Sequence, residues 1–202
     1  MSQKQLLREW YAVNSSSDII KESKEKNGGK LMLTGIIQKA NQLNQNKRVY
    51  PREILRREVE NYQKAVRENR AVGECDHPES SSVSLKNVSH VIREIWWDGD
   101  DVCGRVEVLT NLPSGKILEG LLESGIKLGI SSRGVGSTEK TNEGYDQVQD
   151  DYQIICWDMV SEPSTPGAYL FAEGKKVDFE PRRVFKKEDR IFRALNDIVL
   201  PR

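Results

Sequence analysis

The segment from Ile126 to Ser137 reads I-K-L-G-I-S-S-R-G-V-G-S and places two serines, an arginine and two glycines at the end of a predicted strand. Leu128 and Ile130 share one parity, which is typical of a half-buried strand. A serine beside glycines at a strand end is well placed to attack a carbonyl carbon, and the backbone N–H groups that follow could hold the oxyanion. The same letters also suit an ordinary polar turn, so this segment alone leaves both interpretations open.

A base for such a serine has to come from two histidines, His77 and His90. His77 lies in G-E-C-D-H-P, at the end of a short apolar segment, and functional residues are common on loops held by a scaffold. The proline after it favours extended backbone. A lone histidine is often structural. The acidic neighbours of His77 and the serine elsewhere in the chain favour it as a general base, whereas His90 begins a predicted strand.

A metal site and a cysteine nucleophile are weaker alternatives. Cys75, Asp76 and His77 form one cluster of metal-ligand types, but the second cluster that zinc sites usually need is missing, so we expect no metal. Cys156 falls in the middle of a predicted strand, where cysteine is usually a small buried hydrophobe. The three cysteines are odd in number and widely spaced, which indicates free thiols in a reducing compartment.

Asp158 is the candidate acid, in I-I-C-W-D-M-V-S-E-P-S. A carboxylate inside an otherwise apolar strand is costly unless it is paired. One interpretation is a charge that points to solvent. The functional interpretation is a carboxylate that fixes the tautomer of His77 and stabilises its charged form, as the third member does in serine hydrolases.

Composition excludes several classes of protein. The chain has 202 residues, with 37% hydrophobic residues, which is enough for one domain with a core. Lys and Arg together number 31, as do Asp and Glu, so the chain lacks the net basic charge that would indicate a nucleic-acid binder. No apolar run approaches the ~20 residues of a membrane span, and the N-terminus lacks the apolar core of a signal peptide.

Three parts are predicted along the chain: residues 1–30 as a mostly flexible arm, 31–173 as the folded domain, and 174–202 as a charged segment with a terminal helix over 187–200. Strands outnumber helices, and the two helices of the domain stand between strands. The fold class is therefore α+β, a mostly antiparallel sheet or barrel with helices packed outside. Strands are expected at 31–38, 89–97 and 102–109, helices at 51–69 and 114–124, and a hairpin from 145–148 and 152–160.

Several stretches together resemble the prohead core protease family of tailed bacteriophages, of the large myovirus type, which is similar in fold to the herpesvirus assemblins. They follow the family's order over roughly residues 31–170: N-K-R-V-Y-P (46–51), G-E-C-D-H-P (73–78), W-W-D-G-D-D-V-C-G-R (96–105), G-I-S-S-R-G-V-G-S (129–137), N-E-G-Y (142–145) and W-D-M-V-S-E-P-S-T-P (157–166).

The resemblance implies roles for individual residues. His77 matches the family's histidine base, Ser131 its nucleophile, and Asp158 an acid on a strand after the serine. Assemblins use a second histidine in the third role, but no histidine follows Ser131 here, so an acid fills that role or it is vacant. Arg133 and Gly134 match the segment that lines the oxyanion hole. No cofactor is implied.

The resemblance also implies a function: a serine endopeptidase of capsid maturation, inside the phage prohead in the host cytoplasm. It would cleave scaffold or core proteins and the major capsid protein after Glu in (Leu/Ile)-x-Glu, and then itself. We expect a homo-oligomer, with neither a membrane nor a specific nucleic acid as partner. Sites of that pattern end at Glu9 and Glu22 in the arm, which we expect to be cut first, and at Glu119 and Glu123 in a predicted helix.

Two other functions stay open from the sequence. One is a capsid scaffold or core protein that keeps the protease fold without activity. The other is a cytosolic esterase, which would be expected to carry a G-x-S-x-G elbow. G-I-S-S-R-G does not match that pattern.

Overall fold

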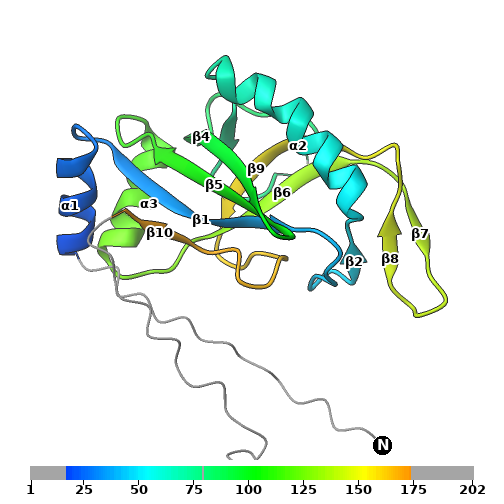
Figure 1. Cartoon of the computed structure of the whole chain (residues 1–202). Helices are drawn as coiled ribbons and strands as arrows, with labels where there is room; N and C mark the ends of the chain where they lie inside the picture. The colour runs from blue at the N-terminus through cyan, green and yellow to red at the C-terminus, as the bar shows by residue number, and fades with distance from the viewer. Residues whose placement is uncertain (1–16, 79, 174–202) are drawn as a thin grey trace, which may run out of the picture.

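The computed structural model describes residues 17–78 and 80–173. Short helices and strands alternate along this part of the chain (Figure 1). In order, they are α1 (Ser17–Lys26), β1 (Leu31–Lys39), β2 (Arg48–Val49), α2 (Arg52–Arg67), β3 (Val72–Glu74), β4 (Val88–Asp98), β5 (Asp101–Val108), α3 (Pro113–Glu123), β6 (Gly129–Val135), β7 (Thr138–Lys140), β8 (Asp146–Val148), β9 (Gln153–Val160) and β10 (Leu170–Ala172).

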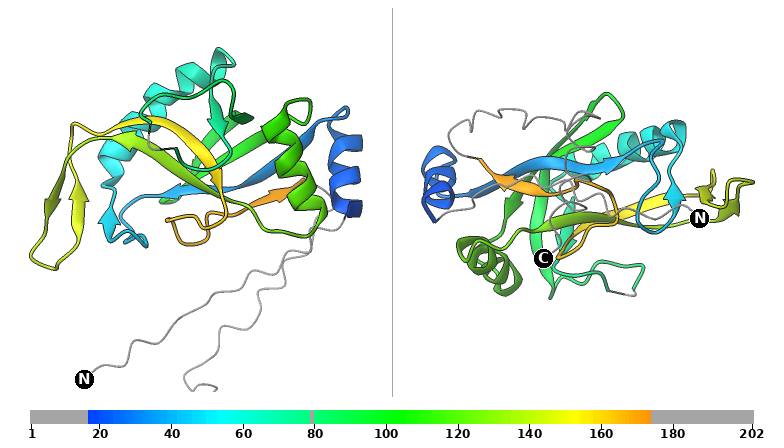
Figure 2. Two further views of the ribbon diagram at one scale, coloured as in Figure 1. Left: turned by 180° about the vertical axis from the view of Figure 1, so that it is seen from behind. Right: turned by 90° about the horizontal axis from the view of Figure 1, so that it is seen from below.

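The largest sheet has the order β10-β1-β5-β4-β3, and all its neighbours are antiparallel. The pair β6–β9 lies across one side of it, as the view from below shows (Figure 2). Isolated bridges join the two sheets at both edges, Cys75 to Met159 and Gly129 to Tyr169. These bridges close the strands into a barrel-like ring, which leaves few unpaired sheet edges.

The interior of this ring is the hydrophobic core, and alternation along each strand fills it. Leu31 and Leu33 of β1 are fully buried, as is Trp157 of β9. Helix α2 covers the core with the apolar face that its sequence spacing predicts, including Leu55, Val59 and Tyr62. The ring of Tyr62 meets that of Trp157 edge to face, with centroids 4.8 Å apart. This contact fixes α2 against the strand that carries Asp158.

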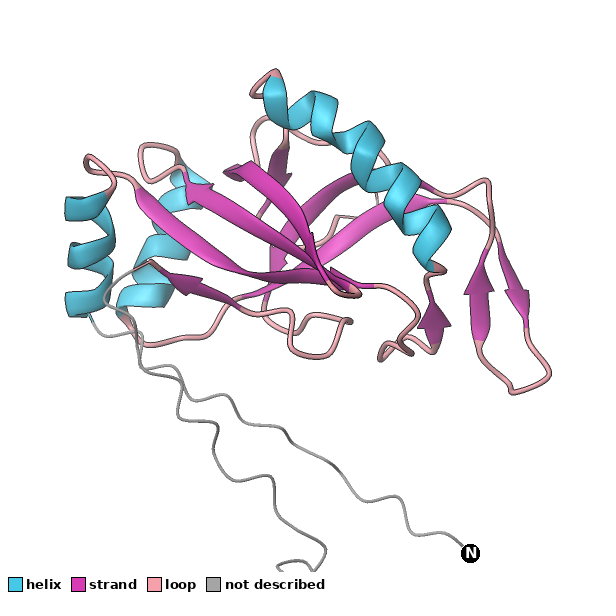
Figure 3. Cartoon of the chain, in the orientation of Figure 1, coloured by secondary structure: helices cyan, strands magenta, loops and turns pink. Residues whose placement is uncertain are grey.

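The predicted fold class is confirmed. The strands are mostly antiparallel, and three helices lie outside them in the described part of the chain (Figure 3). Parallel pairing occurs between β2 and β8, in a small sheet with β7, and at the isolated bridge between Cys75 and Met159. Figure 1 shows this small sheet projecting from one end of the molecule, beyond β6 and β9.

The prediction of a flexible arm over 1–30 is wrong for its second half. Residues 17–26 form α1, where Ile20 is only 1% exposed and the Ser23 hydroxyl donates to the Met32 carbonyl at 3.1 Å. An ion pair between Lys24 and Glu119 joins α1 to α3. The segment is polar overall, but its buried isoleucine, its buried hydroxyl and this ion pair attach it to the rest of the domain. Residues 1–16 lie outside the described part.

The predicted hairpin of 145–148 with 152–160 is also wrong. Strand β8 pairs with β7, whereas β9 pairs with β6. The reason lies in α2: the Glu58 carboxylate accepts from the Ile154 N–H at 3.0 Å, and Arg57 donates to the carbonyls of Asp150 and Tyr152. These bonds hold the start of β9 against the helix and away from β8.

One further expectation concerns the C-terminal end of the chain. The charged segment 174–202, with its predicted terminal helix, lies outside the described residues. Among the helices that the structure describes, none is long and apolar enough to cross a membrane. Within residues 17–78 and 80–173, no three or more His, Cys, Asp or Glu side chains are grouped to hold a metal ion.

Candidate active site

The strand pair β6–β9 carries the centre of the candidate site. Ser131 stands directly opposite Asp158 in the antiparallel register, and Arg133 stands opposite Cys156. Because side chains alternate along a strand, these four share one face of the pair. The other face carries Ile130, Trp157 and Met159, which belong to the core. Of the two adjacent serines, Ser131 is therefore the one on the same face as the acid.

His77 reaches this face from the segment that follows β3. The Glu74 N–H donates to Oδ1 of Asp158 at 3.0 Å, and the Asp76 N–H donates to the Met159 carbonyl at 2.9 Å, so β9 holds both ends of the segment. Asp76 has φ of +67°, a left-handed conformation that is uncommon for a residue with a side chain. The resulting turn brings Nδ1 of His77 to 2.8 Å from Oδ2 of Asp158.

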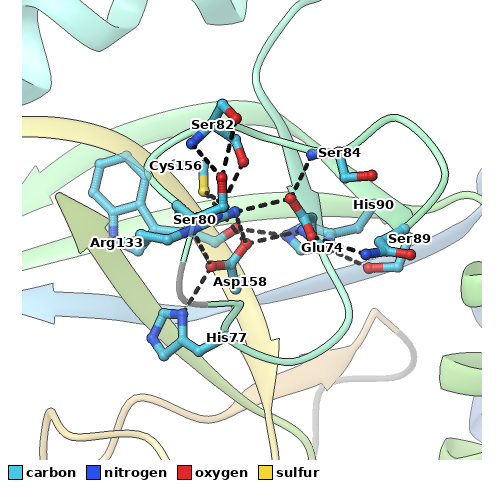
Figure 4. A network of polar contacts seen from close by, with 12 residues as sticks. Glu74, His77, Ser80, Ser82, Ser84, Ser89, His90, Arg133, Cys156 and Asp158 are labelled. Carbon is cyan, nitrogen blue, oxygen red and sulfur yellow. Dashed lines mark hydrogen bonds and ion pairs between the residues drawn. The ribbon is translucent and has the colours of Figure 1, made fainter.

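Asp158 is completely buried and fully paired (Figure 4). Besides His77 and the Glu74 N–H, it accepts from Nε of Arg133 at 2.9 Å and from the Cys156 thiol at 3.3 Å. Burial tends to raise the pKa of Asp158, but the bonds from His77, the Glu74 N–H and Arg133 outweigh it and hold the pKa below its ordinary value. The acid is therefore ionised at neutral pH, and the solvent-facing interpretation is wrong.

An ionised Asp158 determines the tautomer of His77. A carboxylate accepts hydrogen bonds and cannot donate them, so Nδ1 of His77 carries the proton. Nε2 is then free to take a proton, and the side chain of His77 is 39% exposed. This is the arrangement that a general base requires.

Arg133 connects the two buried carboxylates. Its Nη2 lies 3.1 Å from Oε1 of Glu74 and 3.2 Å from Oδ1 of Asp158, while Nη1 donates to the carbonyl of Ser80 at 2.7 Å and that of Ser82 at 3.3 Å (Figure 4). The planar guanidinium suits such a fork of acceptors, whereas lysine does not. Arg133 thus positions the acid and also attaches the loop around residues 80–82 to it.

The charges of this cluster suit a histidine that gains a proton during the reaction. Glu74 and Asp158 contribute two negative charges and Arg133 one positive charge, so the cluster carries one net negative charge beside a neutral His77. A proton on His77 brings the sum to zero. A nearby opposite charge stabilises the protonated form that appears when the base accepts the proton of a nucleophile.

The predicted oxyanion segment consists of Arg133 and Gly134. The guanidinium of Arg133 is turned toward Asp158 and Glu74, so only backbone N–H groups of this segment remain for an oxyanion. A β-bulge separates Arg133 from Gly134. A Cβ at Gly134 would come within 2.6 Å of the Tyr152 ring and of the Gln153 carbonyl. Glycine is needed there because the bulge brings the strand onto that ring.

Ser131 and His77 both line one open cleft of about 860 Å³. Ser132, Gly134 and Arg48, which lies on β2, line the same cleft. Oγ of Ser131 lies 3.4 Å from Oγ of Ser164 and, in the described part of the chain, is not hydrogen bonded to His77. Catalytic hydrogen bonds are often long in the free enzyme and tighten when substrate binds.

The second histidine has a structural role. His90 is fully buried; its Nε2–H donates to the Trp157 carbonyl at 3.0 Å, and its Nδ1 accepts from the Ser89 hydroxyl at 2.9 Å. Burial lowers the pKa of His90 to about 4, so the ring is neutral at neutral pH. A Cβ at Gly73 would come within 2.5 Å of this ring. His90 therefore supports β9 just before Asp158, and His77 is the histidine at the cleft.

Cys156 is likewise unsuited to be a nucleophile. It is fully buried, and burial together with the adjacent Asp158 carboxylate raises the pKa of its thiol to about 12. A thiol that stays protonated is a poor nucleophile. Its role is to donate a weak hydrogen bond to Asp158.

Comparison with known proteins identifies the family. The model of the prohead core protein serine protease family matches residues 13–177. The chain belongs to this family. It is 36% identical over 143 residues to the prohead core protein protease of Enterobacteria phage T4. This alignment covers 69% of this chain and 68% of the T4 protein. It also superimposes on the structure of the bacteriophage T4 capsid assembly protease, gp21, with a TM-score of 0.63 and 35% identity, over 66% of this chain and 84% of that one.

Family membership changes the weight of the open alternatives. The family is one of proteases, so the chain is related to enzymes that cleave polypeptides, and this relationship favours a protease over an esterase.

Sequence reasoning missed the role of the Arg133 side chain. The signal was present: Arg133 is two residues after Ser131, so alternation puts both on one face of a strand.

We expect Arg133→Lys to keep the fold and to lower kcat by roughly tenfold or more, because lysine retains the charge but cannot reach both carboxylates and the loop carbonyls together. Arg133→Met should lower kcat further, and breaking a buried ion pair should cost about 3–5 kcal/mol of stability. Without the guanidinium, the pKa of Asp158 should rise. On acidification, the variant should therefore lose activity at a higher pH than wild type does. Rates measured from pH 4 to 9 for both variants test this, and an unchanged acidic limb in Arg133→Met would contradict it.

Proposed function

We propose that this chain is a serine endopeptidase of capsid maturation, which acts inside the prohead on core or scaffold proteins and on the major capsid protein. Ser131 attacks the scissile carbonyl, and Nε2 of His77 takes its proton and returns it to the leaving amine. Asp158 holds Nδ1–H of His77 and stabilises the imidazolium. Backbone N–H groups around Arg133 and Gly134 stabilise the oxyanion. This reaction uses no cofactor.

One observation carries this proposal: the serine and the acid are opposite each other on one face of β6–β9, and His77 is bonded to that acid at the edge of the cleft. Opposed positions in antiparallel strands have Cβ atoms about 4.5–5.5 Å apart. The imidazole of His77, attached to Asp158, is therefore within reach of Ser131.

The substrate preference that goes with this proposal is cleavage after Glu in (Leu/Ile)-x-Glu. Incubating the purified protein with a mixture of denatured proteins, and sequencing the new ends by mass spectrometry, tests activity and preference together. Wild type should produce ends that follow Glu, and Ser131→Ala should produce none. The inactive core protein, which is the alternative function, predicts no new ends from either. Ester hydrolysis without peptide cleavage would favour an esterase.

Self-cleavage should follow accessibility, and the structure changes the expected order of sites. The Ile20-Lys21-Glu22 site lies inside α1, and the sites at Glu119 and Glu123 lie inside α3. A protease binds its substrate extended, so each helix has to unwind locally before it can be cut. Only the site ending at Glu9 lies outside the described residues.

We therefore expect the fragment that begins at Trp10 to appear first, and fragments that begin at Ser23, Gly120 or Ser124 to appear later or under mild denaturant. N-terminal sequencing of a time course of wild type, with Ser131→Ala alongside, measures this order. Early formation of the Ser23 fragment in native buffer would contradict the protection by α1. The same fragments from Ser131→Ala would show that another protease makes them.

A further inference from the structure

The cleft that holds the nucleophile contains one cation that has no partner among residues 17–78 and 80–173. The ionisable side chains that line the cleft from this part of the chain include Arg48, His77, Arg133 and Glu162. His77 is bonded to Asp158, and Arg133 is bonded to its two carboxylates. The guanidinium of Arg48 makes no ion pair or hydrogen bond with any residue of the described part of the chain, although its register neighbour on β8 is an aspartate, Asp146.

The backbone around Arg48 is held rigidly even though its side chain is free. Oδ1 of the buried Asn44 accepts from the Arg48 N–H at 2.9 Å, and the Asn44 N–H donates to the Arg48 carbonyl at 3.0 Å. The parallel pairing with β8 adds a second anchor. A side chain on a fixed backbone loses less freedom when it binds a ligand, which is the usual basis of a preorganised contact.

Tyr152 also lines the cleft, and it is only 5% exposed. Its hydroxyl is buried and interacts with the side chains of Ser132, Gln38 and Tyr50. The Tyr152 hydroxyl is therefore engaged inside the protein, which leaves the Arg48 guanidinium as the polar group that the cleft offers to a ligand.

The Tyr152 ring itself is tightly held. Its edge meets Tyr50 with centroids 5.3 Å apart, and the bulge at Gly134 lies against its other side. The guanidinium of Arg48 carries a positive charge and offers only hydrogen-bond donors. It therefore suits a ligand group that accepts several hydrogen bonds and carries negative charge. A side-chain carboxylate is the group in a peptide that meets both conditions.

We propose that Arg48 is the residue that binds an acidic side chain of the substrate next to the scissile bond. This inference rests on the proposed function and names the residue that gives it its preference for Glu. Arg48 supplies the charge that separates Glu from Gln, and Tyr152 contributes only a rigid wall of the same cleft. Glu162 has the opposite sign and belongs to the loop after β9, so it is not part of this subsite.

The test uses two peptides that differ only in Glu or Gln immediately before the cleaved bond, with Leu two residues earlier. Wild type should cleave the Glu peptide with kcat/KM roughly tenfold or more above the Gln peptide, as expected for a charge-assisted contact. Arg48→Gln should bring this ratio close to one by lowering kcat/KM for the Glu peptide alone. Arg48→Glu should prefer a third peptide with Lys at that position.

Two further variants make the outcome specific. Tyr152→Phe removes a hydroxyl that is engaged inside the protein, so it should leave the ratio of the Glu and Gln peptides nearly unchanged. Lys47→Gln removes a neighbouring exposed cation that does not line the cleft, and it should keep the wild-type ratio. A lowered ratio in Lys47→Gln as well would mean that general charge attraction sets the preference, which would overturn the assignment to Arg48.

Failure of this inference is distinguishable from failure of the proposed function. If wild type cleaves the Glu peptide and Ser131→Ala does not, the proposed function stands whatever Arg48 does. An Arg48→Gln variant that keeps the wild-type ratio would then overturn the acidic subsite alone. If the Ser131→Ala variant cleaves the Glu peptide as wild type does, the proposed function itself is wrong.

Discussion

Replacing Ser131 with alanine is expected to abolish peptide cleavage, with a loss in kcat on the order of 10⁴ or more, as for other nucleophile deletions. The change removes one hydroxyl at a buried position whose neighbours stay paired with each other, so the fold should persist. Thermal unfolding of the variant should match wild type, and its residual rate in a quenched-peptide assay measures the loss directly.

Ser132→Ala is the matched control. It removes the same group one residue along the strand, but from the face that points toward Trp157 and not toward Asp158. This variant should keep most of its turnover, with at most a modest loss because Ser132 borders the cleft. If Ser132→Ala were inactive and Ser131→Ala active, the face that carries the chemistry would be misassigned.

Asp158→Asn is expected to lower kcat by about 10⁴ and to keep the fold, as for the equivalent change in other triads. An amide can donate toward Nδ1 and so favours the wrong tautomer of His77. The buried charges stay balanced, because Arg133 still pairs with Glu74. Turnover, together with the unfolding midpoint, separates lost catalysis from lost structure.

The rivals for the role of the acid are Glu74, Asp76 and Glu162. Glu74 accepts from Arg133, from the Ser84 N–H and from Asn87, and it has no bond to His77. We therefore expect Asp158 to have no substitute. Near wild-type turnover in Asp158→Asn would transfer its role to a rival or show that a Ser–His pair suffices.

The part of the candidate site that lies on strands could be predicted from the sequence, because local periodicity decides which face of a strand each side chain takes. Alternation along β6 and β9 places Ser131, Arg133 and Asp158 on faces that can be read from the letters alone. The position of His77 could not be derived in this way, because it depends on the left-handed turn at Asp76 and on bonds between the chain after β3 and β9. Those contacts join residues about eighty positions apart.

The errors in the fold have the same origin. The turn between 148 and 152 suggested a hairpin by proximity, but Glu58 and Arg57 on α2 direct β9 to β6 instead. Helix α1 was missed because its composition is polar and its attachment rests mainly on Ile20 and Ser23. In both cases, a few buried tertiary contacts outweighed the local pattern.

The most direct test of the central claim is to label the protein with a fluorophosphonate and to locate the adduct by peptide mass spectrometry. Only a serine activated by a neighbouring base reacts readily with such a reagent. The account predicts a single adduct on Ser131, in parallel with loss of peptide cleavage, and its near absence in His77→Ala. An adduct on another serine, or cleavage that persists after complete labelling of Ser131, would contradict it.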